Sequence, residues 1–258
     1  MRNTILTIIL SILSLPLMAW GPKGHRIIAE VAYSHLCKKT VSQVDALLGK
    51  HGMINWVNWA DEIKSDTIYP YSFTWHFQDL DAGMSDEAVA ATLINYPKEG
   101  GEMWRALDSL KAELQKDKRN IDALKFFIHI TGDTYCPMHV AHIDDRGGNS
   151  VKMKWFGTPT NLHRVWDENM IDSRGFSYTE YAKFLCDKYD VKGKGRSLQS
   201  RADDLVKTYH LTCAVYDWQA AGDTNTYHYI YRFKEEMEWQ LYVAGLRLAD
   251  ELNGLYAK

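Results

Sequence analysis

The 258-residue sequence lacks several features that would each indicate a class of protein. After residue 19, no segment is apolar for long enough to cross a membrane. There is no basic block and the net charge is −3, which argues against binding of duplex DNA by charge alone. A nucleic-acid substrate is still compatible, because metal ions can supply the positive charge that the side chains lack. Repeats, linkers and N-glycosylation acceptors are also missing, so the sequence implies no repeat array and no glycosylation, and nothing in it implies a stable protein partner.

The sequence is not rich in cysteine, and none of its cysteines has the CxxC spacing of a cysteine zinc site, which is therefore not expected. In an oxidising compartment we expect two disulfides, and the sequence leaves all three pairings open. The four residues are Cys37, Cys136, Cys186 and Cys213.

The first nineteen residues have the pattern of a secretory signal peptide. Arg2 precedes an apolar stretch from Ile5 to Leu17, and the small residue Ala19 suits cleavage by a signal peptidase. A membrane anchor is the less favoured alternative, because the stretch is short for a span. Cleavage after Ala19 would leave residues 20–258 as a secreted or periplasmic protein without a membrane segment, and Trp20 would carry the free α-amine.

Apolar residues recur at helical spacing through most of residues 20–258, which predicts a mainly α fold, and the length favours one domain over two small ones. The stretches that begin at Ile27, Val41, Met103, Leu124 and Phe233 show this spacing. Alternating β-branched runs are scarce. We expect at most one short β-hairpin near residues 150–157, with Val151 to Trp155 as its strand.

Two pairs of residues at helical spacing are candidate metal ligands. His129 and Asp133 share one helical face, and Pro137 is expected to end or bend that helix and direct His139 back toward them. His163 and Asp167 repeat the four-residue spacing. A single pair would be explained as well by an ordinary helix contact, but two pairs in one chain favour a metal site.

Three further stretches carry candidate residues. Asp61 lies one helical turn before Lys64, and His76 lies between two aromatic residues. Phe77 is either a core residue or a stacking surface for a nucleic-acid base. At the start of the mature chain, the α-amine and carbonyl of Trp20 are candidate ligands, with His25 five residues away.

Six motifs, in order from Trp20 to about Asp167, resemble the zinc-dependent single-strand-specific nucleases of fungi and plants. They are W-G-x-x-G-H, W-A-D, W-H-F, H-x-x-x-D-x-x-x-P-x-H, D-x-G-G-N and N-L-H-x-x-W-D. Zinc-dependent phospholipases C share this fold and are the nearest alternative. The resemblance implies a helical fold around a cleft with three zinc ions.

The resemblance also implies the ligands of each ion. The first ion would be held by Asp61, His76, His129 and Asp133. The second would be held by the amine and carbonyl of Trp20, by His25 and by Asp133, which has two oxygens and can bridge. The third would be held by His139, His163 and Asp167.

The sequence departs from the family at two positions. Lys64 stands where arginine is common, which keeps the charge but loses the bidentate grip on phosphate. Tyr135 stands where histidine is frequent, outside the implied ligand set. Asp167 follows the nucleases, since the phospholipases usually have glutamate there.

The resemblance therefore implies a zinc-dependent endonuclease that hydrolyses single-stranded DNA and RNA to 5′-phosphate products. Asp133 would hold the ion pair that generates a hydroxide nucleophile at neutral pH, Lys64 would neutralise charge on the phosphate, and Phe77 would stack on a base. Two alternatives stay open: a phospholipase C, and a secreted zinc-binding protein without catalysis.

Overall fold

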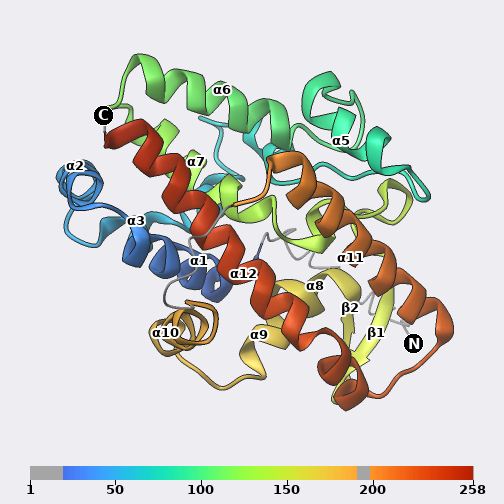
Figure 1. The fold of residues 1–258 in the computed structure, drawn as a ribbon. Helices are drawn as coiled ribbons and strands as arrows, with labels where there is room; N and C mark the ends of the chain where they lie inside the picture. The colour runs from blue at the N-terminus through green and yellow to red at the C-terminus, as the bar shows by residue number, and fades with distance from the viewer. Residues whose placement is uncertain (1–19, 191–197, 258) are drawn as a thin grey trace, which may run out of the picture.

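The computed structural model describes residues 20–190 and 198–257, so the expected signal peptide at residues 1–19 lies outside the described residues. This part of the chain is mainly helical, as the apolar spacing predicts. The longest helix, α12 (Thr226–Tyr256), runs across the face shown in Figure 1 and packs against α1 (Pro22–His35) and α7 (Ile121–Asp133).

The other elements follow in chain order. Before α7 come α2 (Lys38–Leu48), α3 (Gly52–Trp56), α4 (Trp59–Ile63), the 3-10 helix η1 (Ser72–His76), α5 (Asp86–Asn95) and α6 (Met103–Lys116). After α7 come the 3-10 helices η2 (Pro137–His139) and η3 (Ile143–Asp145), then the strands β1 (Lys152–Trp155) and β2 (Thr158–Asn161). The chain continues with α8 (Leu162–Arg164), the π-helical turn η4 (Val165–Asn169), α9 (Met170–Asp172), α10 (Tyr178–Tyr189) and α11 (Arg201–Ala221).

Helix α7 lies at the centre of the core and carries His129 and Asp133. It begins after Asn120, whose side chain accepts a hydrogen bond from the backbone N–H of Ala123, an N-cap that satisfies one of the free donors of the first turn. Every residue from Phe126 to Asp133 is buried. The fold therefore places an imidazole and a carboxyl group inside its apolar core, where each needs a compensating partner.

The predicted hairpin is confirmed, but its second strand reaches further than expected. β1 pairs antiparallel with β2, so the hairpin extends to Asn161 instead of ending near residue 157. Phe156 and Gly157 form the connection, with φ values of 47° and 82°, and this left-handed backbone suits a two-residue hairpin turn. The second strand was not expected, because the segment from Thr158 to Asn161 is polar and contains a proline.

The predicted end of the central helix is only partly right. Helix α7 already ends at Asp133, and Pro137 starts the 3-10 helix η2 instead of terminating α7. The residue before a proline disfavours helical backbone, and Cys136 is extended, which turns the chain toward His139.

The expected disulfides are wrong, since no disulfide joins any of the four cysteines, all of which lie within the described residues. Cys136 is fully buried, with its Sγ 3.5 Å from Oδ1 of Asp167. Cys37 is exposed at the start of α2, and its Sγ lies 3.3 Å from Oγ1 of Thr40. The expectation came from the even number of cysteines together with the predicted signal peptide, neither of which says which cysteines the fold brings together.

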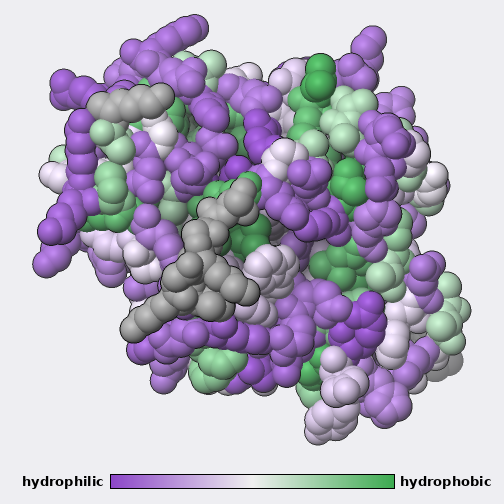
Figure 2. Space-filling model, viewed as in Figure 1, coloured by the Kyte–Doolittle hydropathy of each residue, from purple (hydrophilic) through white to green (hydrophobic). Residues whose placement is uncertain are grey.

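None of the helices among the described residues is long and apolar enough to cross a bilayer. The face shown in Figure 2 is mostly hydrophilic, and its hydrophobic residues form separate patches instead of one continuous area.

The contact between α1 and α12 depends on a glycine, which gives a test of the packing that places His25. A Cβ at Gly245 would lie 2.5 Å from Cγ1 of Val31 and 3.0 Å from the carbonyl oxygen of Ile28. We expect Gly245→Ala to lower the free energy of unfolding by about 1–3 kcal/mol through overpacking. Gly254→Ala, in the same helix with nothing within 4 Å of the new Cβ, should raise it by up to about 1 kcal/mol. Equal effects in urea unfolding would contradict close packing at residue 245.

Candidate metal centre

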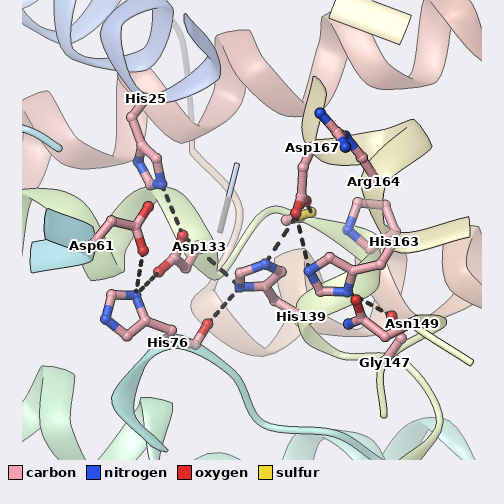
Figure 3. Close-up of polar contacts among 12 residues, drawn as sticks. His25, Asp61, His76, Asp133, His139, Gly147, Asn149, His163, Arg164 and Asp167 are labelled. Atoms are coloured by element: carbon pink, nitrogen blue, oxygen red, sulfur yellow. Dashed lines mark hydrogen bonds and ion pairs between the residues drawn. The ribbon is translucent and has the colours of Figure 1, made fainter. Parts of the chain in front are cut away.

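The predicted histidine and aspartate ligands come from separate segments of the chain and meet in one buried cluster, and Figure 3 labels all of them except His129. Asp61 lies on α4, and its side chain is 7% exposed. The other side chains belong to residues that are at most 5% exposed: His25 on α1, His76 at the end of η1, His129 and Asp133 on α7, His139 at the end of η2, His163 on α8 and Asp167 in η4.

Asp133 lies at the centre of the first half of the cluster, and its two oxygens face different histidines. Its Oδ1 is 3.1 Å from Nε2 of His25, and its Oδ2 is 3.2 Å from Nδ1 of His76 and 3.4 Å from Nε2 of His129. The Oδ1 atom of Asp61 lies 3.6 Å from His76 and 3.7 Å from His129. This arrangement suits a carboxylate that can bind two neighbouring cations, one through each oxygen.

The second half of the cluster is built around Asp167. Its Oδ2 is 3.0 Å from Nε2 of His163, and its Oδ1 is 3.9 Å from Nε2 of His139. His139 lies between the two halves in Figure 3, with its Nδ1 3.9 Å from Oδ1 of Asp133. The predicted histidine and aspartate ligands are thus brought together in one continuous cluster.

Backbone carbonyls fix the tautomers of three of the histidines. Nδ1 of His129 donates to the carbonyl of Val57 at 2.6 Å, and Nδ1 of His163 donates to the carbonyl of Gly147 at 2.6 Å. Nδ1 of His139 donates to the carbonyl of His76 at 2.5 Å. Since a carbonyl can only accept, Nε2 of each neutral ring is left with a lone pair, and this is the usual support of a metal-bound histidine.

Burial favours the neutral form of both kinds of group. It holds the pKa of His25, His76 and His139 well below the usual value, and neighbouring histidines lower it further. Burial also raises the pKa of Asp133 well above its usual value, with a further contribution from the charge of Asp61. The pKa of Asp167 is raised to about 6, again mainly by burial. A cation among these groups would stabilise the ionised carboxylates.

Unpaired atoms test whether the residues fit zinc. Nε2 of His76, Nε2 of His139 and Oδ2 of Asp61 are buried and have no hydrogen-bond partner among the described residues. Lone pairs of neutral imidazoles that face carboxylate oxygens repel each other unless a proton or a cation lies between them. Imidazole nitrogens and carboxylate oxygens are ligands that zinc accepts, so the donor set fits this metal.

A cleft of about 290 Å³ opens onto this cluster. His76, His139 and His163 line it, whereas Asp133 is fully buried. Phe73 and Phe77 also line the cleft, and their ring centroids are 5.9 Å apart in an edge-to-face arrangement. The cleft therefore combines metal-ligand side chains with an aromatic surface.

Charged side chains complete the lining of the cleft. Nζ of Lys64 lies 3.2 Å from Oδ1 of Asp61, so the predicted phosphate-binding cation also pairs with a predicted ligand. Arg146 adds a second cation, and burial raises the pKa of Asp79 to about 8.

Sequence reasoning missed Arg146, Asp79 and Phe73. Their only signal was proximity: Arg146 lies within the D-x-G-G-N motif, and Asp79 and Phe73 lie three residues from His76.

Trp20 is held beside the cluster at the start of the described chain. Its side chain is fully buried, and a Cβ at Gly24 would lie 3.1 Å from Cβ of Trp20. The next backbone N–H, that of Gly21, donates to the carbonyl of Asp167 at 2.9 Å. The beginning of residues 20–258 is therefore attached to a segment that carries a predicted ligand.

Comparison with known proteins places this geometry in a family. A sequence model described as S1/P1 nuclease matches residues 20–257. Nuclease S1 of Aspergillus oryzae is 27% identical over 221 residues, which cover 81% of this chain and 75% of the relative. Endonuclease 2 of Arabidopsis thaliana is 26% identical over 275 residues, which cover 92% of this chain and 90% of the relative. Endonuclease 3 of the same plant is 30% identical over 169 residues, which cover 60% and 56%.

The two-sided position of Asp133 leads to a prediction about metal content. Because its two oxygens face different histidines, Asp133→Asn should remove about two zinc ions per chain, whereas Asp167→Asn should remove about one. Elemental analysis after dialysis measures the zinc, and circular dichroism checks that both variants keep their helices. Loss of the same number of ions from both variants would show that Asp133 does not bridge.

Proposed function

The chain belongs to the S1/P1 nuclease family and is therefore a phosphodiester hydrolase, and we propose that its substrates are single-stranded DNA and RNA. We further propose that it works with three zinc ions, releases 5′-phosphate products and is exported after cleavage of residues 1–19. Residues 20–258 would then form one nuclease domain.

One observation supports the choice of a single strand. The aromatic side chains of Phe73 and Phe77 line the same cleft as His76 and His139. A base can stack on an aromatic side chain only after it has left its neighbours in the strand, which is far easier in a single strand than in a duplex.

Zinc would be held by the three ligand groups around Asp133 and Asp167, with the α-amine and carbonyl of Trp20 completing the set of His25. When bound, zinc would supply Lewis-acid stabilisation of the phosphate and an activated nucleophile at neutral pH. The chain's own contribution is to hold these ligand side chains in position. The two oxygens of Asp133 face different histidines, and the carbonyls of Val57 and Gly147 keep two imidazoles in the metal-binding tautomer.

The cations of the cleft would receive the phosphate. Lys64 and Arg146 line it, and their positive charges oppose the charge that builds up on the non-bridging oxygens during hydrolysis. Lys64 is also held by Asp61, so its ammonium group is positioned before substrate arrives. Phe77 would orient the nucleotide by stacking on its base.

A side-by-side assay tests this function. Protein that starts at Trp20, supplied with zinc, is incubated separately with single-stranded DNA, RNA, duplex DNA and phosphatidylcholine, and the product ends are identified by mass spectrometry. We expect fast cleavage of both single strands to 5′-phosphate ends, slow cleavage of the duplex and hardly any lipid hydrolysis. Fast lipid hydrolysis with intact nucleic acid would assign the chain to phospholipase activity instead. Equal rates on single strand and duplex would refute the proposed preference.

The role of Phe77 gives a kinetic prediction. Base stacking is worth about 1–3 kcal/mol per base, so Phe77→Ala should raise KM for a single-stranded oligonucleotide by about 5- to 150-fold with a smaller change in kcat. Tyr231→Ala removes an aromatic residue that is 90% exposed on α12 and serves as the control, with KM unchanged. If KM is the same in both variants, Phe77 is only a packing residue.

The proposed ligand role of Trp20 gives a second prediction. A form that begins Met-Trp converts the Trp20 nitrogen into an amide, which is a poor ligand at neutral pH. It should fold with the same helical content, because Trp20 is still buried. Its kcat should fall, and the relative change in kcat should be larger than the relative change in KM. Removal of the extra methionine by an aminopeptidase should restore activity without refolding. Equal kcat and equal zinc content in the two forms would show that Trp20 only fills space at the chain start.

A further inference from the structure

A buried thiol lies next to the second half of the metal cluster. Cys136 is fully buried, and its Sγ is 3.5 Å from Oδ1 of Asp167. The ligand atoms of Cys136, His139 and Asp167 all lie within 4.8 Å of one another. The absence of CxxC spacing argued against a cysteine zinc site, but that rule concerns pairs of cysteines and does not cover one cysteine paired with a histidine.

The local backbone turns Cys136 and His139 toward the same side. The sequence Cys-Pro-Met-His is closed by a hydrogen bond from the backbone N–H of His139 to the carbonyl of Cys136, at 3.0 Å. Cys136 is the extended residue before this 3-10 turn, and His139 is the last residue of the turn. Both side chains approach Asp167, whose Oδ2 lies 3.0 Å from Nε2 of His163.

An independent observation also points to a ligand at this place. Nε2 of His139 is buried and has no hydrogen-bond partner among the described residues, while its Nδ1 is used by the carbonyl of His76. The free lone pair of this ring lies 3.9 Å from Oδ1 of Asp167, the same oxygen that Cys136 approaches.

The distances agree with the edges of a tetrahedral site. With sulfur at about 2.3 Å and oxygen at about 2.1 Å from zinc, the two ligand atoms lie about 3.6 Å apart, and a nitrogen and an oxygen lie about 3.4 Å apart. The observed separations from Oδ1 of Asp167 are 3.5 Å for the sulfur and 3.9 Å for the nitrogen. Small side-chain adjustments would bring all three atoms onto one ion.

We propose that Cys136 is a thiolate ligand of the metal position that is also held by His139, His163 and Asp167. The inference rests on the proposed zinc-dependent function. On coordination, the S–H bond breaks, the sulfur keeps the electron pair for the bond to the metal, and the proton passes to solvent. Four protein donors fill a tetrahedral sphere, so this ion resembles those of closed sites and should be the last that a chelator removes.

Cobalt substitution tests the proposal, because a thiolate bound to tetrahedral Co²⁺ gives a charge-transfer absorption in the near ultraviolet that nitrogen and oxygen ligands do not give. The whole mature protein is loaded with Co²⁺, its metal content is measured, and its spectrum is compared with those of Cys136→Ser and Cys213→Ser. Cys213 is half-buried on α11 and serves as the control. We expect the band in the wild type and in Cys213→Ser, and its loss in Cys136→Ser.

A measurement on the unaltered protein covers the case in which Cys136→Ser does not fold. X-ray absorption of the zinc-loaded wild type should show a sulfur neighbour at about 2.3 Å from zinc. Full loading with cobalt and zinc but without the band and without the sulfur neighbour would overturn the thiolate ligand and leave the proposed function intact. Failure to bind either metal would overturn both proposals.

Discussion

The structure depends on one energetically unfavourable feature: Asp133 and several neutral imidazoles are buried inside an apolar helical core. Isolated, these groups would cost several kcal/mol, since neither the carboxylate nor the lone pairs of the rings can reach water. The surrounding helices keep these groups away from solvent: Asp133 is fully buried on α7, and His25 is fully buried on α1. A proton or a cation between the nitrogen and oxygen atoms reduces this cost. Metal binding would therefore stabilise the fold, and apparent stability should rise with metal concentration.

The loops around the cluster contribute as much as the helices, because they orient the rings. Val57, His76 and Gly147 lie outside regular helix or at its end, where their carbonyls are free to accept from histidine. Gly147 has a φ of 64°, and a Cβ there would lie 2.7 Å from the carbonyl oxygen of Met138. The tight D-x-G-G-N segment is thus a packing requirement of the site, and it also presents Arg146 to the cleft.

Sequence reasoning predicted the helices and the clustering of the ligand pairs, because both follow from short-range periodicity. His129 and Asp133, four residues apart on one helix, must share a face, and the resemblance supplied the remaining ligands. The second strand was missed because its polar residues show no alternation. The disulfides were wrong because cysteine number carries no information about distance. The ion pair of Lys64 with Asp61 and the place of Asp79 in the cleft depend on how separate segments pack, which a single sequence does not encode locally.

The two halves of the cluster differ in chemistry although they share His139 as a neighbour. The half around Asp133 offers nitrogen and oxygen atoms only, and His76 connects it to the cleft beside Phe77. The half around Asp167 is attached to the start of the described chain through Gly21, and a buried thiol lies beside it. Both halves reach the cleft, the first through His76 and the second through His139 and His163. A set of nitrogen and oxygen donors suits an ion that exchanges ligands with a phosphodiester, whereas a set that includes sulfur suits retention of its ion. With Cys136 as a ligand, the two halves would therefore differ in how readily their ions exchange ligands.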